Sequence, residues 1–465
     1  MNARSFALPL LALCFCAPGL AQEEQPRRSV IYFIGDGMGT DQVTLGRLAA
    51  KKLGRAYGLD RFREVGLVST HSANFVVTDS AAGATALACG AKTNNQVIGL
   101  APDGRRLQSV LEAAHACGYL TGLATTTRIT HATPAAFAAH VQHRKDEPLV
   151  AEQLAARGFP EVLVGGGRIF FPKERLARLE EQGYAVVTDP QAFLNTEARI
   201  RAGRPRLAAI LAPSHLPYRI DGGPRVSLRD IARKAVAALS ATGRPFFLMV
   251  EGGRIDHAGH MHDAATLVGE QLEFAEAVDW ALDRAVRDPN LLVVVTADHA
   301  TGSLGISEKT DVSALLEAKA SAEALVRRAG KLVDPAGRER LRKLVLESHG
   351  VKLSDADLER IAANAGNKYH APTVLGHLLS AARGVHFYSP ELQEAELTNT
   401  HGHDGSQVPI YAFGPEADWF AGTYENTEVP KKIVGILDLS AGVEAQSPLA
   451  PKSVPGRPRT SKYFK

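Results

Sequence analysis

The first candidate for chemistry is a serine at the start of a run of small residues. Thr78, Asp79 and Ser80 precede a segment of Ala, Gly and Thr that extends to residue 86 and has the composition of a helix. Ser or Asp at a helix start accepts hydrogen bonds from the first free N–H groups. The same helix end attracts phosphate through its free donors and its dipole. Taken alone, the triplet predicts a helix cap, with a hydroxyl close to where an anion would bind.

Acidic residues and histidines follow three strongly apolar segments. They are Asp36 after 30–34, Glu251 after 246–250, and Asp298 with His299 after 291–295. Short apolar segments rich in β-branched residues are typical of buried parallel strands. In such sheets, ligands bind beyond the carboxyl ends of the strands. We therefore expect these carboxylates and imidazoles to gather at one edge of a sheet.

A second concentration of metal-binding side chains lies between residues 256 and 262. Asp256 and His260 are four residues apart, so on a helix they face the same side and could hold one metal ion. His257 and His262 lie beside them. A lone histidine is more often structural, but several histidines beside aspartates at strand ends indicate a metal site. Histidine with carboxylate suits Zn²⁺, whereas carboxylate with a Thr hydroxyl and water suits Mg²⁺.

Strand-like and helix-like segments alternate along the chain. Strands are predicted at 30–34, 66–70, 119–126, 162–164, 246–250, 291–295 and 408–413, and helices over 43–52, 80–90, 107–117, 134–140 and 263–286. This alternation predicts an α/β fold, a three-layer sandwich with a central, mostly parallel sheet. Segment 308–383 is helical, charged and rich in Ala and Leu, and we interpret it as a largely helical insertion. Thr40 or Asp41 is the predicted cap of the first helix.

The two ends of the chain have other compositions. Residues 1–21 contain a basic start, an apolar segment and small residues before a cleavage site near Ala21, which is typical of a signal peptide. We therefore expect a periplasmic or secreted protein, and the apolar segment is too short to span a membrane. Residues 441–465 are rich in proline and predict a flexible tail. The catalytic domain is expected to span 22–440.

Composition excludes some classes of protein and leaves one question open. A net charge of +3 over 465 residues, without basic segments interleaved with aromatics, does not indicate nucleic-acid binding. Cys89 and Cys117 remain after removal of the signal peptide. An exported protein could pair them, although a buried free thiol is the favoured state for Cys89.

In their order along the chain, the motifs resemble those of the alkaline phosphatase family. The matching segments are 34–39, 78–86, 131–134 with Arg144 downstream, 250–257, 296–299, and His403 ahead of the last strand. The resemblance covers nearly all of the mature sequence. It implies a homodimeric enzyme that hydrolyses small phosphate monoesters through a phosphoserine, with two Zn²⁺ and one Mg²⁺ as cofactors.

The resemblance also implies a role for each matching residue. Ser80 matches the nucleophile and Arg144 the arginine that holds the phosphate. The implied ligands are Asp256, His260 and His403 for one zinc, Asp36, Asp298 and His299 for the second, and Asp36, Thr133 and Glu251 for magnesium. Asp79 adjoins the nucleophile, and we expect it to position the loop and orient Arg144.

Two positions depart from the enteric-bacterial pattern of the family. His131 and His257 stand where those enzymes have Asp and Lys, whereas animal-type and many other bacterial members have histidine at both. Loss of a carboxylate beside the third metal could weaken Mg²⁺ or admit Zn²⁺ or Co²⁺. His401 is an alternative to His403, although the spacing to Gly414 favours His403.

Two other functions stay open. One is a phosphodiesterase or sulfatase of the same superfamily. A sulfatase would need a Cys or Ser in a C/S-x-P-x-R context, and the match at 453–457 lies in the predicted tail, where no metal ligand is near in sequence. The other is an exported protein that binds metal or phosphate without catalysis, which the complete set of nucleophile and ligands disfavours.

Overall fold

A ten-stranded sheet forms the centre of the computed structural model, which describes residues 27–195, 206–223, 225–366, 368–388 and 402–450. The strand order is β14-β2-β13-β8-β1-β7-β3-β4-β6-β5. The strands are β1 (Ser29–Ile34), β2 (Glu64–Ser69), β3 (Leu120–Arg128), β4 (Val162–Gly166), β5 (Ala185–Val187), β6 (Leu207–Ile210), β7 (Phe246–Glu251), β8 (Leu291–Thr296), β13 (Val408–Phe413) and β14 (Gly422–Glu425).

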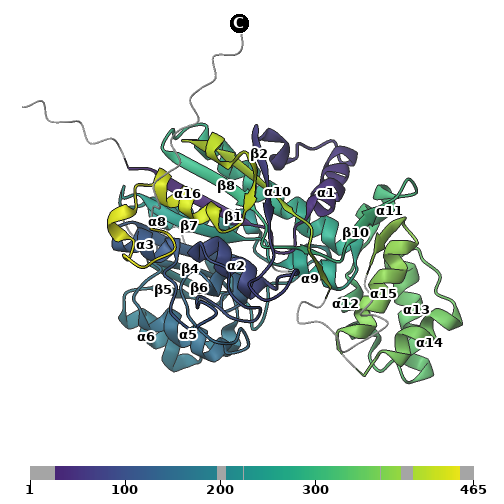
Figure 1. Ribbon diagram of the computed structural model, residues 1–465. Helices are drawn as coiled ribbons and strands as arrows, with labels where there is room; N and C mark the ends of the chain where they lie inside the picture. Colours follow the sequence, from purple (N-terminus) through teal and green to yellow (C-terminus); the bar gives the residue numbers. More distant parts are fainter. Residues whose placement is uncertain (1–26, 196–205, 224, 367, 389–401, 451–465) are drawn as a thin grey trace, which may run out of the picture.

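Helices cover the sheet in two layers (Figure 1), one packed around α10 and one around α16. The helices of this main body are α1 (Thr40–Lys52), α2 (Ser80–Cys89), α3 (Val110–Ala116), α4 (Ala132–Ala135), α5 (Glu147–Ala156), α6 (Lys173–Glu181), α7 (Pro190–Leu194), α8 (Leu228–Ser240), α9 (Arg254–His260), α10 (Ala264–Ala285) and α16 (Glu428–Ile436). Short 3₁₀ helices are η1 (Gly58–Arg61), η2 (Arg168–Phe170), η4 (Arg219–Asp221), η6 (Ala417–Phe420) and η7 (Ser440–Gly442). The predicted α/β three-layer architecture is confirmed.

The register of the central strands aligns the ends that carry the acidic residues. β1 runs parallel to β7 and β8, and Ile34 at its end pairs with Glu251 and Thr296. β3 also runs parallel to β7, with Thr125 opposite Glu251. All residues of β7 and β8 are buried, because helices cover both faces of a parallel sheet. The turns after β1, β7 and β8 therefore leave the sheet at the same edge.

The late strand β13 departs from the parallel arrangement, because it runs antiparallel to both β2 and β8. It enters the sheet between them and its residues 408–412 are buried. Strand identity is visible in the apolar composition of this segment, but strand direction is not. The sheet is therefore mostly, not wholly, parallel.

Segment 308–383 forms helices, as its composition predicts. They are α11 (Val312–Glu317), α12 (Ala322–Ala329), α13 (Pro335–His349), α14 (Asp355–Ala363) and α15 (His370–Ala381). Leu325, Leu341 and Leu375 belong to an apolar cluster of this segment that is separate from the main core. At its base, β10 (Leu304–Ile306) pairs antiparallel with β11 (Val385–Phe387). Figure 1 shows these helices grouped at one side of the sheet.

Several helix ends differ from the sequence prediction. Helix α1 includes Thr40 and Asp41, and its cap position is Gly39 without a side-chain hydrogen bond, so the predicted cap is wrong. Helix α3 begins at Val110, because Ser109 and Glu112 form a reciprocal capping box. Helix α4 ends at Ala135 and is shorter than predicted. The long helix α10 agrees with the prediction, and Asp263 caps it through the N–H of Thr266.

The first part of the predicted flexible tail is folded. Leu449 is 1% exposed, and the Gln108 side chain donates a 2.8 Å hydrogen bond to the Gly442 carbonyl. Arg106 contacts Glu444 at 2.9 Å. Burial of Leu449 and these polar contacts hold residues 441–450 against the body, so the tail prediction is wrong there. Residues 451–465, the signal-peptide prediction for 1–21, and His401 lie outside the described residues.

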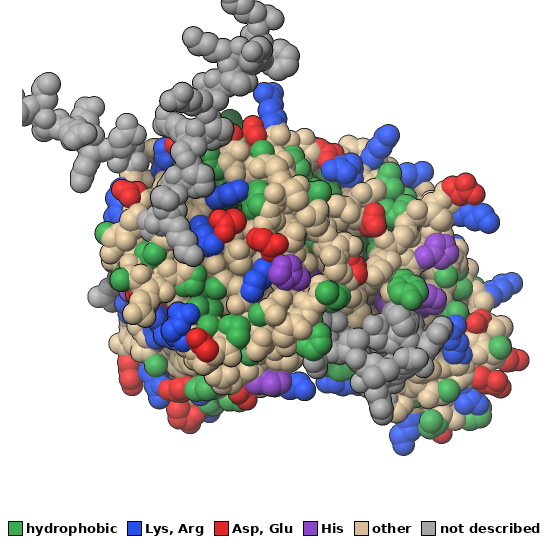
Figure 2. All heavy atoms as spheres, viewed as in Figure 1, with side chains coloured by type: hydrophobic (Ala, Val, Ile, Leu, Met, Phe, Trp, Pro, Cys, Tyr) green, Lys and Arg blue, Asp and Glu red, His purple; other side chains and the backbone are tan. Residues whose placement is uncertain are grey.

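Cys89 and Cys117 are both free, which settles the question that the sequence leaves open. Cys89 lies in the main core, and burial raises the pKa of its thiol well above the ordinary value. No helix in the described part of the chain has the length and apolar composition that a bilayer crossing requires. Figure 2 shows basic and acidic side chains interspersed over one face of the molecule, in keeping with the small net charge of +3.

Candidate active site

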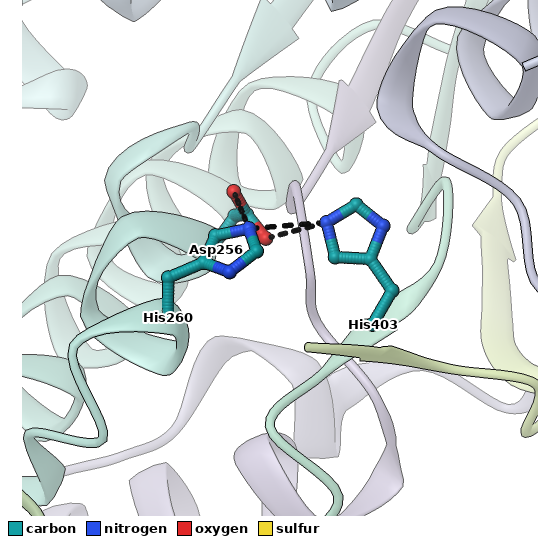
Figure 3. Close-up of side chains that lie close together, drawn as sticks. All are labelled: Asp256, His260 and His403. Carbon is teal, nitrogen blue, oxygen red and sulfur yellow. Dashed lines mark hydrogen bonds and ion pairs between the residues drawn. The ribbon is translucent and has the colours of Figure 1, made fainter. Parts of the chain in front are cut away.

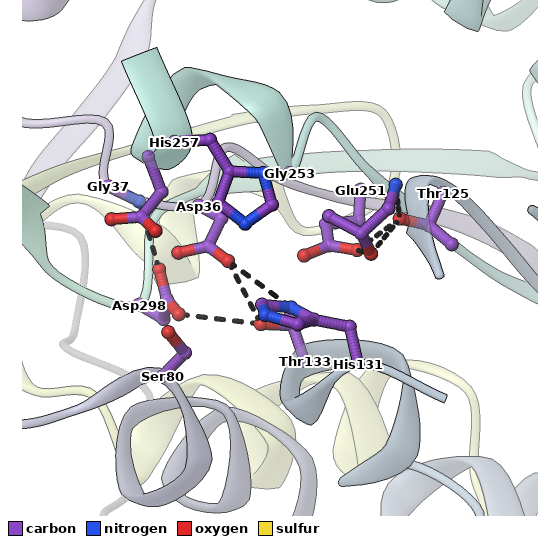
Figure 4. A network of polar contacts seen from close by, with 12 residues as sticks. Asp36, Gly37, Ser80, Thr125, His131, Thr133, Glu251, Gly253, His257 and Asp298 are labelled. Atoms are coloured by element: carbon purple, nitrogen blue, oxygen red, sulfur yellow. Dashed lines mark hydrogen bonds and ion pairs between the residues drawn. The ribbon is translucent and has the colours of Figure 1, made fainter. Parts of the chain in front are cut away.

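Three buried carboxylates meet at the strand edge, as the sequence predicts. Asp36 follows β1, Glu251 ends β7 and Asp298 follows β8, and all three are 0% exposed. The Thr133 hydroxyl lies 3.5 Å from both Asp36 Oδ2 and Asp298 Oδ2. Figure 4 shows these side chains converging from opposite sides of one small space. Separate strands thus bring like charges together in the protein interior.

The serine of the opening motif faces this space from the start of α2. Asp79 is the cap residue of that helix, and its Oδ1 accepts a 3.0 Å hydrogen bond from the Ala82 N–H. Ser80 is therefore the first helical residue rather than the cap, and its Oγ lies 3.1 Å from His299 Nε2. Figure 4 places Ser80 beside Asp298. The hydroxyl sits at a helix N-terminus, next to the carboxylate cluster.

The predicted helical pair of Asp256 and His260 is present on α9, and His403 joins it (Figure 3). Asp256 Oδ2 lies 3.3 Å from His260 Nε2, and Asp256 Oδ1 lies 3.5 Å from His403 Nε2. The two Nε2 atoms are 3.1 Å apart. Two imidazole nitrogens and a carboxylate that converge in this way suit one metal ion.

A short strand pair brings His403 to this position. β12 (His403–Asp404) pairs antiparallel with β9 (Ala300–Thr301), directly after the Asp298–His299 motif. The His403 and His299 rings stack with centroids 3.6 Å apart. Thr301 also donates a 2.7 Å hydrogen bond to Asp256 Oδ1. Thr301 orients a candidate metal ligand, and the sequence offers no pattern that singles it out.

Three groups of ligand atoms lie close enough to hold metal ions. They are Asp256 with His260 and His403, Asp36 with Asp256 and His299, and Asp36 with His131 and Glu251. Within each group the ligand atoms lie within 4.8 Å of one another. Asp298 lies 3.4 Å from His299 Nε2 and so borders the second group. The groups share Asp36 and Asp256, which makes them parts of one centre.

The electrostatics of the centre favour bound cations. Burial and then the neighbouring carboxylates raise the pKa of Asp36 and Asp298 well above the usual range. Burial raises the pKa of Glu251 to about 7. Burial alone would also raise the pKa of Asp256, but His260 and His403 outweigh it and hold this pKa well below its ordinary value. A cluster of buried carboxylates with too few cationic partners is stable as charged groups only when cations neutralise it.

Unsatisfied polar atoms give the same indication. Asp36 Oδ1, Glu251 Oε1 and His131 Nδ1 are buried and make no hydrogen bond to the described residues. Buried polar atoms of native proteins are nearly always bonded, so exceptions of this kind mark a place for an ion or water. All three atoms belong to residues of the ligand groups. The donor set therefore fits divalent metal ions.

Arg144 is held beside the serine by Asp79. Its Nη1 donates to Asp79 Oδ2 at 3.1 Å, and its Nη2 lies 3.2 Å from His131 Nε2. Asp79 Oδ2 also accepts a 3.1 Å hydrogen bond from the Gln96 N–H. Asp79 thus caps α2 through one oxygen and anchors the guanidinium through the other.

His131 and His257 are joined by a third histidine that the sequence did not single out. His215 lies in the loop after β6, and its ring centroid is 5.6 Å from that of His131 and 4.3 Å from that of His257. Burial lowers the pKa of all three imidazoles well below the ordinary value. No motif surrounds His215, so only the folded chain could reveal it. Thr125 and Thr127, which donate to Glu251 Oε2, were missed for the same reason.

A cavity of about 790 Å³ opens onto these residues. Ser80, Arg144, His260 and His403 lie along its wall, and residues of α12 and α15 form the opposite side. The predicted site residues therefore lie on this wall, in the metal-binding groups behind it, or, for Thr133 and Asp298, directly beside those groups. A serine hydroxyl, an arginine fork and several candidate cation sites around one cavity suit a reaction at phosphate.

Comparisons with known proteins give the same assignment. The family model of alkaline phosphatase matches residues 27–439. The chain is 33% identical over 422 residues to alkaline phosphatase 3 of Bacillus subtilis, covering 87% of this chain and 88% of that protein. The alkaline phosphatase of Thermus thermophilus superimposes with a TM-score of 0.79 at 28% identity, covering 89% of this chain and 92% of that one.

A further solved structure concerns the metal sites. It is a variant of the alkaline phosphatase of the Antarctic bacterium TAB5, with one histidine replaced by aspartate and Mg bound in a site called M3. It superimposes with a TM-score of 0.63 at 27% identity, covering 89% of this chain and 99% of that one. With the family model matched over nearly the whole described chain, this protein belongs to the alkaline phosphatase family.

Proposed function

We propose that the chain hydrolyses phosphate monoesters to an alcohol and inorganic phosphate through a phosphoserine on Ser80. One observation carries the proposal: the Ser80 hydroxyl lies at a helix N-terminus, 3.1 Å from His299, beside both a carboxylate cluster and Arg144. Ser80 Oγ attacks phosphorus, the bond to the leaving oxygen breaks, and the alcohol departs with a proton. Water then cleaves the phosphoserine and releases phosphate.

The proposed ligand sets are those that the family resemblance implies. Asp256, His260 and His403 would hold one zinc, Asp36, Asp298 and His299 the second, and Asp36, Thr133 and Glu251 magnesium. When bound, such ions lower the pKa of a coordinated hydroxyl or water and neutralise negative charge on phosphate. Thr301 and the backbone N–H of Gly37 hold the carboxylates of Asp256 and Asp298 in orientation through hydrogen bonds of 2.7 and 3.2 Å.

Arg144 is the side chain that we propose binds the phosphate directly, in addition to the metal ions. A guanidinium presents a planar pair of N–H donors that match two phosphate oxygens. Asp79 occupies one side of the group through Nη1, which fixes its plane before substrate arrives. The free N–H groups at the start of α2 add a second source of positive potential.

The third metal site is the one whose metal ion has more than one candidate. His131 Nδ1 lies 3.9 Å from Asp36 Oδ2 and makes no hydrogen bond to the described residues. An imidazole at this place suits Zn²⁺ or Co²⁺ better than Mg²⁺. In the TAB5 enzyme, the variant with aspartate in place of a histidine binds Mg in its M3 site. Mg²⁺, which the family resemblance implies with Asp36, Thr133 and Glu251 as ligands, stays our proposal. His131 makes Zn²⁺ or Co²⁺ the alternative, and elemental analysis of purified protein distinguishes them.

The sequence expectations for cell location and assembly complete the proposal. Residues 1–21 would direct export and be removed near Ala21, leaving 22–440 as the catalytic domain with 308–383 as an inserted cap region. The exported enzyme would act as a homodimer in the periplasm or outside the cell.

Comparison of an aryl phosphate with its bis-aryl diester tests the reaction class. We expect kcat/KM for the monoester to exceed that for the diester, because Arg144 and the metal centre face a terminal phosphate with two negative charges. The two substrates share one leaving group, so a steady-state assay of the released phenol serves both. Faster hydrolysis of the diester would replace the proposal by a phosphodiesterase.

Variants of Asp79 separate its two contacts. In Asp79→Asn the amide oxygen can still accept the Ala82 N–H, whereas the charged contact to Arg144 and the hydrogen bond from the Gln96 N–H are lost. We expect KM for an aryl phosphate to rise about tenfold in this variant, with a smaller decrease in the melting temperature than in Asp79→Ala. Asp79→Ala also removes the helix cap, which costs about 1 kcal/mol of unfolding free energy.

Phosphate inhibition constants and thermal melting of both variants provide the measurement. The positioning role of Asp79 predicts weaker phosphate binding in both variants, and a lower melting temperature in Asp79→Ala. Unchanged phosphate affinity in Asp79→Asn would show that Arg144 does not depend on this carboxylate.

A further inference from the structure

The cavity extends well beyond the phosphate site. From Ser80 it reaches α12 and α15 of the helical insertion, with a volume of about 790 Å³. Four cationic side chains line this outer part, and we call them the cationic wall: Lys145, Arg254, Arg327 and Lys368. None of them belongs to the metal-binding groups or contacts Ser80. The space they line is available to the alcohol part of a substrate.

Arg254 is the most rigid member of the cationic wall. It is 8% exposed, its guanidinium lies over the Tyr218 ring at 3.6 Å, and its Nη1 lies 2.7 Å from His257 Nδ1. These contacts fix the plane of the group. The Arg254 Nε atom is buried and makes no hydrogen bond to the described residues. A guanidinium in a fixed plane is prepared to bind an anion at little entropic cost.

The wall carries more positive than negative charge. Glu323 Oε2 lies 3.7 Å from Arg254 Nη2, and Glu323 Oε1 lies 3.8 Å from Arg327 Nη1, so one carboxylate is shared by two guanidinium groups. Both distances exceed a hydrogen bond. Within the described residues, no carboxylate lies within ion-pair distance of Lys145 or Lys368.

Two other arginines on the cavity wall have a carboxylate partner at hydrogen-bond distance. Arg128 makes two hydrogen bonds of 2.8 and 2.7 Å to Glu147, whereas Arg144 makes one hydrogen bond of 3.1 Å to Asp79 and keeps a side for phosphate. Among the described residues, no carboxylate lies at such a distance from Arg254 or Arg327, and Glu323 at 3.7 and 3.8 Å is the nearest in the ion pairs that they form. Carboxylates therefore offset the positive charge of the cationic wall only in part, and the remaining positive potential extends into the space for the substrate.

We propose that the cationic wall binds a second anionic group of the substrate. The preferred substrates are then phosphate monoesters whose alcohol part carries a carboxylate or another phosphate, and a cationic alcohol part is disfavoured. This inference rests on the proposed phosphatase function, because it assigns the leaving group of the same reaction. Arg254 provides the fixed contact, whereas Arg327, Lys145 and Lys368 contribute charge from the rim.

Three small monoesters that differ in the charge of the alcohol part provide the test. They are 3-phosphoglycerate (anionic), glycerol 3-phosphate (neutral) and phosphocholine (cationic). For the wild-type metal-loaded protein we expect kcat/KM to decrease in that order. The spread should shrink at high salt, because screening weakens interactions between exposed charges.

Four variants test whether the cationic wall causes the dependence of kcat/KM on the charge of the alcohol part. The ratio of kcat/KM for 3-phosphoglycerate to that for glycerol 3-phosphate should fall about tenfold in R254Q, since a charge-assisted contact is lost. It should fall about two- to threefold in the more exposed R327Q. R328Q is the matched control, because Arg328 neighbours Arg327 on α12, carries the same charge and lies outside the cavity lining. E323Q should raise the ratio, because it removes the carboxylate that the two arginines share.

The opposite sign expected for E323Q excludes a merely structural role. If the Arg254–Glu323 contact only fastened the insertion to the body, R254Q and E323Q would lower kcat/KM for all three substrates equally, and the inference would be overturned. Hydrolysis of all three substrates with equal kcat/KM would also overturn the inference, while the proposed function would stand. Failure to hydrolyse any of the three would instead reject the proposed function, and the inference with it.

Discussion

Replacement of Ser80 by alanine should lower kcat/KM for an aryl phosphate at least about a thousandfold, because the proposed nucleophile is removed. It should also abolish the phosphoenzyme that we expect acid quenching to trap from the wild-type protein. Radiolabelled phosphate that stays with acid-precipitated protein is the direct measurement. The loss should appear in kcat, since Arg144 and the metal centre would still bind phosphate.

The structure predicts that this variant folds. Asp79, not Ser80, caps α2, so the helix start keeps its hydrogen bond from the Ala82 N–H. The substitution removes one oxygen atom and the 3.1 Å contact to His299. The melting temperature should therefore stay within a few degrees of the wild-type value.

Ser406→Ala is the matched control for this experiment. Ser406 is exposed, and it lies only three residues after His403. The same atom is lost, and both activity and acid-stable label should persist. Label that persists in Ser80→Ala would place the phosphoryl acceptor on another residue and contradict the proposed mechanism.

The strand edge was predictable from sequence because each of its carboxylates directly follows an apolar strand. Asp36, Glu251 and Asp298 needed only the rule that parallel strands end on one side. The Asp256–His260 pair needed only helical spacing, which α9 provides. Local sequence is sufficient for such residues because the element that carries them also fixes their direction.

Other parts of the centre depend on contacts between distant segments. His403 reaches Asp256 through the pairing of β12 with β9, and Thr301 orients Asp256 from that same pair. His215 joins His131 and His257 from a loop without a motif. The antiparallel direction of β13 belongs to this class too. No local period or spacing encodes such pairings, so the sequence could not reveal them without the resemblance.

The choice between Asp79 and Ser80 as the helix cap shows the limit in another way. Both residue types are good caps, and their positions differ by one. The structure gives the cap to Asp79, which frees the Ser80 hydroxyl to face His299. A one-residue difference that local propensity cannot decide thus determines which side chain is available for chemistry.

Removal of divalent cations should abolish activity and destabilise the fold, and zinc should restore both. In the metal-free chain, burial raises the pKa of Glu251 to about 7 and raises those of Asp36 and Asp298 well above their usual range. Through these three carboxyl groups, the native state binds more protons than the unfolded state above about pH 4.5. Their contribution to the unfolding free energy then falls as the pH rises, by about 1.4 kcal/mol per pH unit for each proton concerned.

The stabilisation by zinc should consequently increase with pH. Buried histidines such as His299 have a lowered pKa, and this opposes the carboxylate effect only below about pH 6.5, where unfolded histidines are charged. Above that pH the carboxylates dominate, and zinc competes with their remaining protons. Thermal melting of chelated and zinc-loaded protein between pH 5 and about pH 8 measures the difference. A zinc-induced shift that is independent of pH would contradict this account, as would full activity after exhaustive chelation.

Asp298→Asn provides the sharpest form of this test, because it should stabilise the chelated protein while abolishing activity. The amide oxygen can still accept the 3.2 and 3.1 Å hydrogen bonds from the Gly37 and His299 N–H groups, whereas the variant no longer has to bury a carboxyl group that either takes up a proton or carries a charge. Burial, Asp256 and Glu251 raise the pKa of Asp298, so removal of this carboxyl should be worth about 1–3 kcal/mol of unfolding free energy without metal near neutral pH. Asp418→Asn, at an exposed position, should change neither quantity. A chelated Asp298→Asn protein that melts below the chelated wild type would show that the carboxylates do not strain the metal-free fold.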